Sequence, residues 1–124
     1  MGRGLSELQS FILKKASEAP VMDPRGEFAS SRLPHLFVPE ILIGFWGWEP
    51  EKPVRDERGH KEIGYYFSRK RIGEARYNRG MAAVSRAVAR LEARGLVERY
   101  SWLNTSSVVI THSGRAWLMV KQPT

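Results

Sequence analysis

The sequence predicts a mainly α-helical domain with a small β-hairpin, which is an α+β fold. Apolar residues recur at helical spacing in three separate stretches, near residues 6–17, 38–46 and 78–94. Two extended runs between residues 97 and 111 flank a short polar segment, which is the pattern of a hairpin. With 124 residues and no cysteine, the chain is long enough to bury a core without disulfides. We therefore expect a single domain over residues 1–124.

The first helix is expected from about Ser6 to Ser17. Ser6 and Gln9 have the spacing of a capping box, in which each side chain accepts a hydrogen bond from the backbone N–H of the other residue. Residues 19–36 contain three prolines and a glycine without a steady period, so we expect an irregular loop there. Apolar residues on one stripe of this helix are expected to pack on the core: Leu5, Leu8, Ile12 and Ala16.

The second predicted helix runs from Val38 to Trp46. Pro39 suits its first turn, where a backbone N–H has no partner within the helix. Gly47 suits the position that ends the helix. Trp46 and Trp48 are either a stacking platform for single-stranded nucleic acid or part of the core. We favour the core, because large aromatic side chains contribute much of the buried area of a small domain.

A polar stretch separates this helix from the main one. Residues 49–62 are charged and are interrupted by two prolines and a glycine, so we expect an exposed irregular loop. Gly73 and Gly80 weaken a continuous helix in the residues that follow. Helical structure as early as Arg71 is the alternative, but we place the start of the main helix near Asn78, a favoured N-cap residue, and its end near Arg94.

The main helix has two different faces. Its apolar residues share one side, which is expected to face the core: Val84, Ala87, Val88 and Leu91. A second set falls nearly opposite, at offsets of three, four and four residues: Arg79, Ala82, Arg86 and Arg90. A helix that enters a DNA groove needs this division. Its apolar side anchors it, while long cations and small residues face the bases and phosphates.

The positive charge is concentrated on this helix and on the residues before it. The chain has a net charge of +7. Residues 68–99 hold nine basic and three acidic side chains, whereas residues 1–67 hold nine basic and ten acidic ones. Such clustering is typical of a protein that binds a polyanion. A solvated basic helix without a ligand is the alternative explanation.

We expect the main helix, near residues 78–94, to enter the major groove of duplex DNA. Cations at its start and before it are expected to bind the phosphate backbone: Arg69, Lys70, Arg71 and Arg76. Further candidate contacts to bases and phosphates lie along the helix itself: Asn78, Arg79, Ala82, Ser85, Arg86 and Arg90.

A β-hairpin is expected over residues 97–111, directly after the main helix. Gly95 can adopt the left-handed conformation that ends a helix. The tip of the hairpin is predicted at Asn104, Thr105 and Ser106. Asn104 and Thr105 are candidate contacts to sugar and phosphate, and an ordinary surface turn is the equal alternative.

A short helix is expected to close the chain. Thr111 suits its N-cap position. Three of its residues are expected to pack on the first helix: Ala116, Trp117 and Val120.

The main helix and the hairpin also carry a family resemblance. Residues 83–86 read Ala-Val-Ser-Arg, and residues 90–99 read Arg-Leu-Glu-Ala-Arg-Gly-Leu-Val-Glu-Arg. They resemble the recognition helix and the start of the wing in MarR-like winged-helix regulators. Residues 108–115, Val-Val-Ile-Thr-His-Ser-Gly-Arg, resemble the end of the wing and the turn after it. The resemblance covers about a third of the chain. It implies a winged helix-turn-helix fold in which the hairpin is the wing and the DNA-facing residues include Ser85, Arg86 and Arg90.

Three features depart from that family. The hairpin tip lacks the aspartate-x-arginine pattern of MarR proteins. The stretch between residues 38–46 and the main helix is longer than the family's tight turn. Long terminal helices of the kind that build a MarR dimer are not expected, so a dimer of that shape is not implied. A homodimer of another shape would prefer two half-sites about one helical turn apart.

The residue pattern argues against an enzyme. Without cysteine, the chain has no thiol nucleophile and no thiolate metal ligand. His35, His60 and His112 lie far apart, in no metal-ligand spacing, and are expected on the surface or in turns. The chain shows no phosphate-binding loop, dinucleotide-binding or nucleophile-elbow pattern. We therefore expect no catalytic residue, no metal and no cofactor.

The sequence also favours a cytoplasmic protein with no membrane partner. Its longest apolar stretch, residues 41–48, is too short to cross a bilayer. The residues after Arg3 lack the apolar core of an export signal. The absence of cysteine suits a reducing compartment.

These patterns predict a winged helix-turn-helix protein that binds duplex DNA as a transcriptional regulator. Two alternatives stay open. One is a winged helix that serves as a protein–protein or assembly module, with its basic face against an acidic partner. The other is an RNA-binding or ribosome-associated protein. The sequence indicates neither the operator nor an effector ligand.

Overall fold

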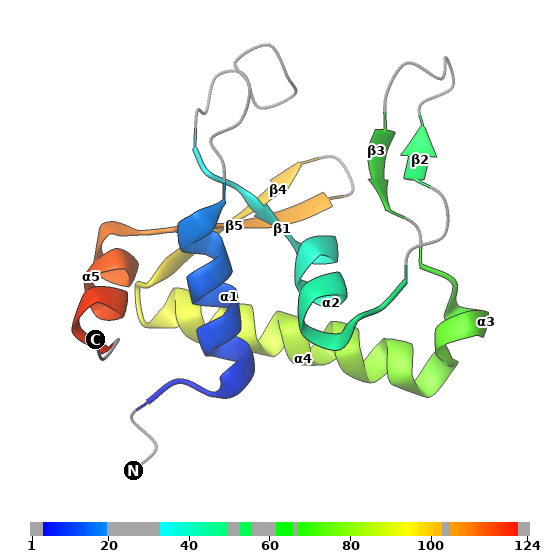
Figure 1. The fold of residues 1–124 in the computed structure, drawn as a ribbon, viewed down its shortest axis with the longest axis horizontal. Helices are drawn as coiled ribbons and strands as arrows, with labels where there is room; N and C mark the ends of the chain where they lie inside the picture. The colour runs from blue at the N-terminus through cyan, green and yellow to red at the C-terminus, as the bar shows by residue number, and fades with distance from the viewer. Residues whose placement is uncertain are drawn as a thin grey trace.

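The computed structural model describes residues 4–19, 33–49, 53–55, 62–65, 67–102 and 105–121. They form a mainly helical structure with a small antiparallel sheet of three strands, which confirms the α+β prediction (Figure 1). In chain order the elements are α1 (Glu7–Glu18), β1 (Leu36–Phe37), α2 (Val38–Trp46), β2 (Pro53–Arg55), β3 (Glu62–Tyr65), α3 (Arg69–Ile72), α4 (Glu74–Ala93), β4 (Val97–Trp102), β5 (Thr105–Ile110) and α5 (His112–Lys121).

Helix α1 begins where the sequence predicts. Ser6 Oγ accepts a hydrogen bond from the Gln9 N–H, and Gln9 Oε1 accepts one from the Ser6 N–H, both at 3.1 Å. The capping box thus satisfies two N–H groups that have no partner inside the helix. Ile12, Leu13 and Ala16 are fully buried, so this side of α1 packs on the core as expected.

Helix α2 has the bounds that the sequence predicts. Pro39 lies in its first turn, and Gly47 ends it in the left-handed conformation, with φ of 69°. Trp48 is only 4% exposed and belongs to the core, and the half-buried Trp46 stacks on it with ring centroids 6.0 Å apart. The preference for core packing over a stacking platform is confirmed for these two residues.

Helix α4 is longer than predicted. The start near Asn78 is wrong, because the helix begins at Glu74 and Asn78 lies in its second turn. Gly73 separates α3 from α4 with φ of 98°, a value that residues with a Cβ rarely adopt. The helix ends at Ala93, and Gly95 closes it with φ of 75°. Gly73, which we expected to weaken the helix, instead marks where it begins.

Helix α4 continues through Gly80, and this glycine makes room for a neighbouring aromatic side chain. It is buried inside the helix, and a Cβ there would lie 2.5 Å from Cζ2 of Trp48. Trp48 also stacks on Tyr77 of α4, with ring centroids 5.6 Å apart. Glycine lowers helix propensity, but its missing side chain lets a tryptophan lie directly against the helix.

The three-stranded sheet has the order β1–β5–β4, with both pairs antiparallel. The hairpin is confirmed, but its predicted tip is wrong in part, because Thr105 and Ser106 belong to β5. Thr105 pairs with Trp102, and residues 103–104 between them lie outside the described residues. Leu36, the last residue of the loop predicted for residues 19–36, belongs to strand β1, and residues 20–32 of that loop lie outside the described residues. Two residues are too short a run to show a strand alternation.

The irregular loop predicted for residues 49–62 is also wrong in part. Strand β2 lies inside it and pairs antiparallel with β3, from Pro53 opposite Tyr65 to Arg55 opposite Glu62. Pro53 is tolerated because it is the first residue of its strand. The remaining residues of this loop, 50–52 and 56–61, lie outside the described residues.

Thr111 caps helix α5 as predicted. Its Oγ accepts a hydrogen bond from the Gly114 N–H at 3.0 Å and donates one to the Gly95 carbonyl at 2.7 Å. The predicted packing holds for Trp117, which is half-buried against the core. It is wrong for Ala116 and Val120, which are exposed. Gly114 lies against the Leu96 backbone, where a side chain would not fit.

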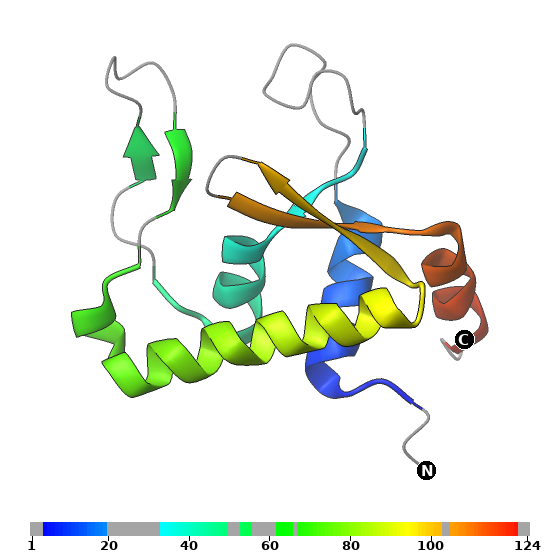
Figure 2. The ribbon, with the colours of Figure 1, turned by 180° about the vertical axis from the view of Figure 1, so that it is seen from behind.

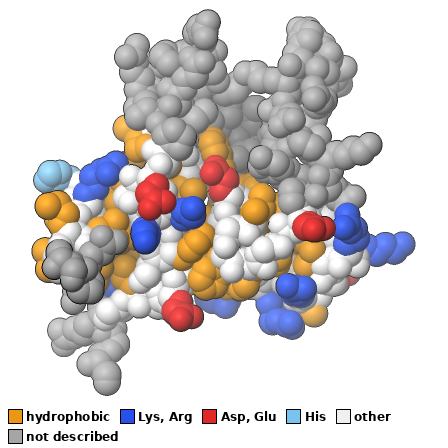
Figure 3. All heavy atoms as spheres, in the orientation of Figure 1, with side chains coloured by type: hydrophobic (Ala, Val, Ile, Leu, Met, Phe, Trp, Pro, Cys, Tyr) orange, Lys and Arg blue, Asp and Glu red, His pale blue; other side chains and the backbone are white. Residues whose placement is uncertain are grey.

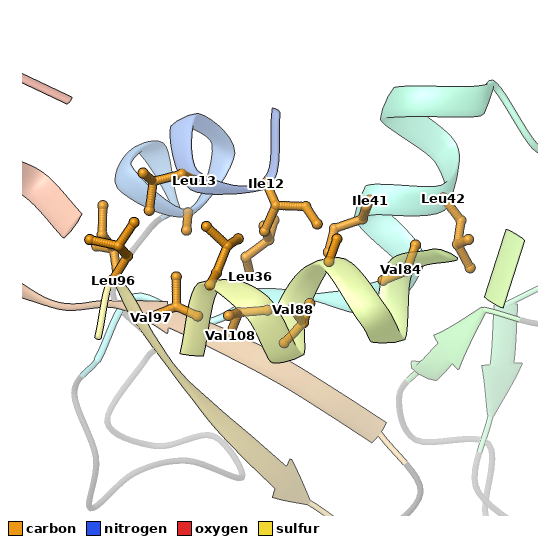
Figure 4. Close-up of a cluster of buried hydrophobic side chains, with 14 of the residues drawn as sticks. Ile12, Leu13, Leu36, Ile41, Leu42, Val84, Val88, Leu96, Val97 and Val108 are labelled. Carbon is orange, nitrogen blue, oxygen red and sulfur yellow. The ribbon is translucent and has the colours of Figure 1, made fainter. Parts of the chain in front are cut away.

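The helices and the sheet enclose one cluster of buried side chains. Helices α1 and α2 cross α4, and the sheet packs against all three (Figure 1). In Figure 4, Val84 and Val88 of α4 point toward Ile12 of α1 and Ile41 of α2, with Val108 of β5 nearby. This core fixes which side of α4 is left to solvent. Among the described residues, no helix combines the length and apolar character needed to cross a membrane.

Candidate nucleic-acid interface

One side of α4 packs on the core, and the opposite side faces solvent. The buried side is the one that the periodicity predicts: Gly80, Val84, Ala87, Val88 and Leu91. The predicted outer face is exposed at every position: Arg79, Ala82, Arg86 and Arg90. In Figure 2, α4 lies along the front of the molecule next to β4, and no described element covers its outer side.

Four arginines on α4 form no ion pair with any carboxylate of the described residues. Arg76, Arg79, Arg86 and Arg90 are exposed, and within the described ranges no carboxylate forms an ion pair with any of them. Unneutralised guanidinium groups along one helix create a positive potential that attracts a polyanion. Exposed small residues lie on the same outer side, including Ser85 and the alanines Ala82 and Ala89. Their size lets a partner approach the helix backbone closely.

The corner between α3 and α4 holds Arg69 in place. Its guanidinium lies 4.5 Å from the centroid of the Tyr77 ring and 3.7 Å from the Glu74 carboxylate. It also donates a hydrogen bond to Asn78 Oδ1 at 3.2 Å. Asn78 is therefore not an N-cap, as predicted, but an acceptor that positions Arg69. The fold thus brings two of the predicted site residues, Arg69 and Asn78, into direct contact.

The other two cations of α3 have different surroundings. Arg71 forms an ion pair with Glu49 at 3.3 Å, which ties α3 to the residues after α2. Ser68 Oγ accepts a hydrogen bond from the Arg71 N–H at 3.2 Å and so caps α3. Lys70 is exposed, and none of the described carboxylates pairs with it. Of the three cations on α3, Lys70 therefore has the charge most available to a ligand.

Arg99 is a residue that we did not predict for the interface. It lies on β4 on the same face as the buried Val97, because alternate residues of a strand share a face. Its guanidinium therefore reaches α4, where it donates a hydrogen bond to the Ser85 carbonyl at 3.2 Å. Its place in the basic stretch of residues 68–99 was the available signal, but only the fold places it beside α4.

The two predicted contacts at the hairpin tip are placed only in part. Thr105 is the first residue of β5, and Asn104 lies outside the described residues. Their contact with sugar and phosphate therefore stays a prediction.

A buried histidine supports the hairpin. His35 was expected on the surface, but it is only 3% exposed, and its Nδ1 is hydrogen-bonded to Ser107 Oγ at 2.9 Å. The Tyr100 ring packs against it in an edge-to-face arrangement, with centroids 5.2 Å apart. Burial lowers the pKa of His35, so the imidazole is neutral at pH 7. The Tyr100 hydroxyl donates a hydrogen bond to Glu98 at 3.0 Å, which raises the pKa of Tyr100.

The described residues form no group of three or more side chains that could hold a metal ion. His112 is exposed at the start of α5, as expected, and His60 lies outside the described residues.

The side of the molecule that carries α1 and α2 has mixed charge, unlike the basic outer side of α4. Figure 3 shows the side that carries α1 and α2, where acidic and basic side chains are interspersed with apolar ones. Basic side chains gather along its lower edge, below α4, and at the end that carries α3 (Figure 3). The positive surface therefore belongs to α3 and α4.

Comparison of this chain with known protein families, with curated proteins and with solved structures finds no match. The candidate interface therefore rests on the chain's own geometry and charge.

Proposed function

We propose that this chain is a winged helix-turn-helix protein that binds duplex DNA, with α4 in the major groove and the β4–β5 hairpin as the wing. The exposed face of α4 carries the proposal. On it, Arg79, Arg86 and Arg90 have no carboxylate partner within the described residues. A role in transcriptional regulation is part of the proposal and follows from the MarR-like resemblance of residues 83–99 and 108–115.

The order of the elements supports the assignment of the wing. A winged helix-turn-helix has a hairpin directly after its reading helix. Here α1, β1, α2, α4, β4 and β5 follow in that order, and the sheet order is β1–β5–β4. The connection from α2 to α4 also contains β2, β3 and α3, so it is longer than a tight turn.

The shape of α4 favours DNA over RNA. Its 20 residues give a helix about 30 Å long. The major groove of B-DNA, about 12 Å wide, admits such a helix, whereas that of duplex RNA is too narrow for its bases to be read. An exposed helix with a continuous basic face is therefore better suited to DNA.

In this proposal, three cations bind the phosphate backbone around α4. Lys70 and Arg76 lie near the N-terminal end of the helix, and both are exposed. Arg99 lies beside the middle of the helix, next to Ser85. These contacts orient the protein on the duplex without reading its sequence.

A salt titration tests the proposal. Binding to a random-sequence DNA duplex and to the matching RNA duplex is measured between about 50 and 200 mM salt. With at least Lys70, Arg76 and Arg99 on phosphates, the logarithm of the DNA-binding constant is expected to fall with a slope of about −3 or steeper against log salt. Absence of salt-dependent binding to either duplex would exclude nucleic-acid binding and favour the assembly module. Preference for the RNA duplex would favour the RNA-binding alternative.

Matched variants test whether α4 binds the DNA. Arg86→Ala and Arg90→Ala are expected to weaken binding without loss of folding, because both side chains are exposed. Arg115→Ala is the control, because it removes an equally exposed arginine from α5. Equal weakening by all three would indicate an effect of net charge alone. Unfolding of Arg86→Ala would show that the faces of α4 are assigned wrongly.

A further inference from the structure

Two arginines lie close to the centre of the exposed face of α4. At about 100° per residue, the point opposite the buried stripe falls at Ala82. Arg79 and Arg86 lie within about 60° of that point, one on each neighbouring turn. Arg76 and Arg90 lie farther toward one edge of the face. The two central arginines are therefore the ones directed toward the floor of a groove that receives α4.

The spacing of these two arginines matches that of separate base pairs. They are seven residues apart, which is about 10.5 Å along the helix axis. Base pairs of B-DNA follow one another at about 3.4 Å along the duplex axis, and the path along the inclined groove is longer for each base pair, so the two positions are about two or three base-pair steps apart. Each arginine therefore meets a different base pair.

The chemistry of the three central residues selects particular base edges. An arginine donates two parallel hydrogen bonds to O6 and N7 of guanine, the pair of acceptors that its planar fork matches. No described carboxylate pairs with Arg79 or Arg86, so their donors are not committed to an ion pair within the described chain. Ala82 lies between them and presents a methyl group, which suits contact with the C5-methyl group of thymine.

We propose that α4 reads a short DNA element with two guanines about two or three base-pair steps apart and a thymine between them. Arg79 and Arg86 each bind one guanine, and Ala82 contacts the thymine methyl. Arg76 and Arg90, nearer the edge of the face, bind phosphates instead. This assignment rests on the proposed function, because it requires α4 to lie in the major groove.

Selection from a duplex library with a randomised centre tests the assignment with the full chain. The wild type is expected to enrich sequences that hold the two guanines and the thymine at this spacing. Arg79→Ala and Arg86→Ala are each expected to relax the preference at one guanine only. Arg90→Ala is expected to weaken binding about equally for all sequences, as the loss of a phosphate contact does. Melting curves of each variant verify that it is folded.

Single-atom changes in the selected duplex identify the contacts. Replacing one guanine by 7-deazaguanine removes its N7 acceptor and is expected to weaken wild-type binding about 5- to 100-fold. The same change should have no effect on the variant that lacks the arginine facing it. Replacing the thymine by deoxyuridine removes the methyl group and should weaken binding of the wild type more than that of Ala82→Gly.

The two proposals fail in different ways. Salt-dependent duplex binding without an enriched guanine pair would overturn the base assignment and leave duplex binding standing. The assignment would also be overturned if 7-deazaguanine weakened Arg79→Ala and Arg86→Ala as much as the wild type. Absence of duplex binding at any salt concentration would overturn both.

Discussion

The guanidinium of Arg99 on β4 donates a hydrogen bond to the main-chain carbonyl of Ser85 on α4, at 3.2 Å. This bond joins the hairpin to the middle of the proposed reading helix. Both residues are exposed, so the remaining donors of the guanidinium lie at the surface beside the outer face of α4. One side chain can therefore set the position of the hairpin and bind a phosphate next to the groove.

Arg99→Ala is expected to weaken DNA binding several-fold and to reduce the salt slope by about 0.9, the value for one phosphate contact. The free energy of unfolding should change by less than about 1 kcal/mol, because an exposed polar contact contributes little. Binding titrations and urea denaturation measure the two effects. Arg115→Ala is the control. An equal reduction of the salt slope by both variants would contradict a specific phosphate contact of Arg99.

Most helix ends were predicted well because their signals are local, although α4 begins at Glu74 and not near Asn78. The capping box at Ser6, Pro39 in the first turn of α2, and Gly95 after α4 each act within a few residues of a helix end. The buried stripe of α4 also follows from periodicity, since every third or fourth residue faces the core. Its outer face could therefore be identified before the fold was known.

The errors concern features that depend on distant residues. Strand β1 is two residues long and exists because β5 pairs with it. His35 is buried because Ser107 and Tyr100, far along the chain, lie against it. Arg99 reaches Ser85 only after the hairpin has folded back on α4. No local pattern encodes such contacts.

Gly114→Ala is expected to lower the free energy of unfolding by about 1 to 3 kcal/mol or more, as overpacking does. A Cβ at Gly114 would overlap the main-chain oxygen of Leu96 and lie 2.7 Å from Cγ1 of Ile110. Backbone cannot move aside as a flexible side chain can. Gly4→Ala is the matched control, because nothing lies within 4 Å of a Cβ at that position. Urea denaturation of both variants measures the difference, and equal stability would show that the α5 contact relaxes easily.

His35 is expected to make stability depend on pH. Burial lowers its pKa in the folded state, whereas the unfolded chain has the ordinary value of about 6.5. Above that pH neither state binds the proton, and stability is complete. As the pH falls below about 6.5, the unfolded state binds a proton that the folded state does not, so the free energy of unfolding decreases. The decrease ends once the pH is below the lowered pKa.

The comparison of wild type with His35→Gln isolates this effect. Glutamine can keep a hydrogen bond to Ser107 but does not titrate, while the carboxylates titrate equally in both proteins. The free energy of unfolding is measured by urea denaturation from neutral to mildly acidic pH. The wild type should lose more stability than the variant over this range. Parallel profiles would mean that the folded protein accepts the proton on His35 without cost.

At the start of α4, Arg69 is expected to contribute to stability and Lys70 to DNA binding. Arg69 contacts Tyr77, Asn78 and Glu74, so Arg69→Ala should lower the free energy of unfolding by about 0.5 to 1 kcal/mol, the range for an exposed cation over an aromatic ring. Lys70 has no described carboxylate partner, so Lys70→Ala should leave stability unchanged and reduce the salt slope of DNA binding by about 0.9.

Denaturation and salt titration of the same two variants provide the check, because both remove one positive charge from α3. Their difference therefore reports on the contacts and not on net charge. A loss of stability in Lys70→Ala that equals the loss in Arg69→Ala would contradict the structural role given to Arg69. An unchanged salt slope in Lys70→Ala would place the DNA backbone away from this corner and confine the interface to the outer face of α4.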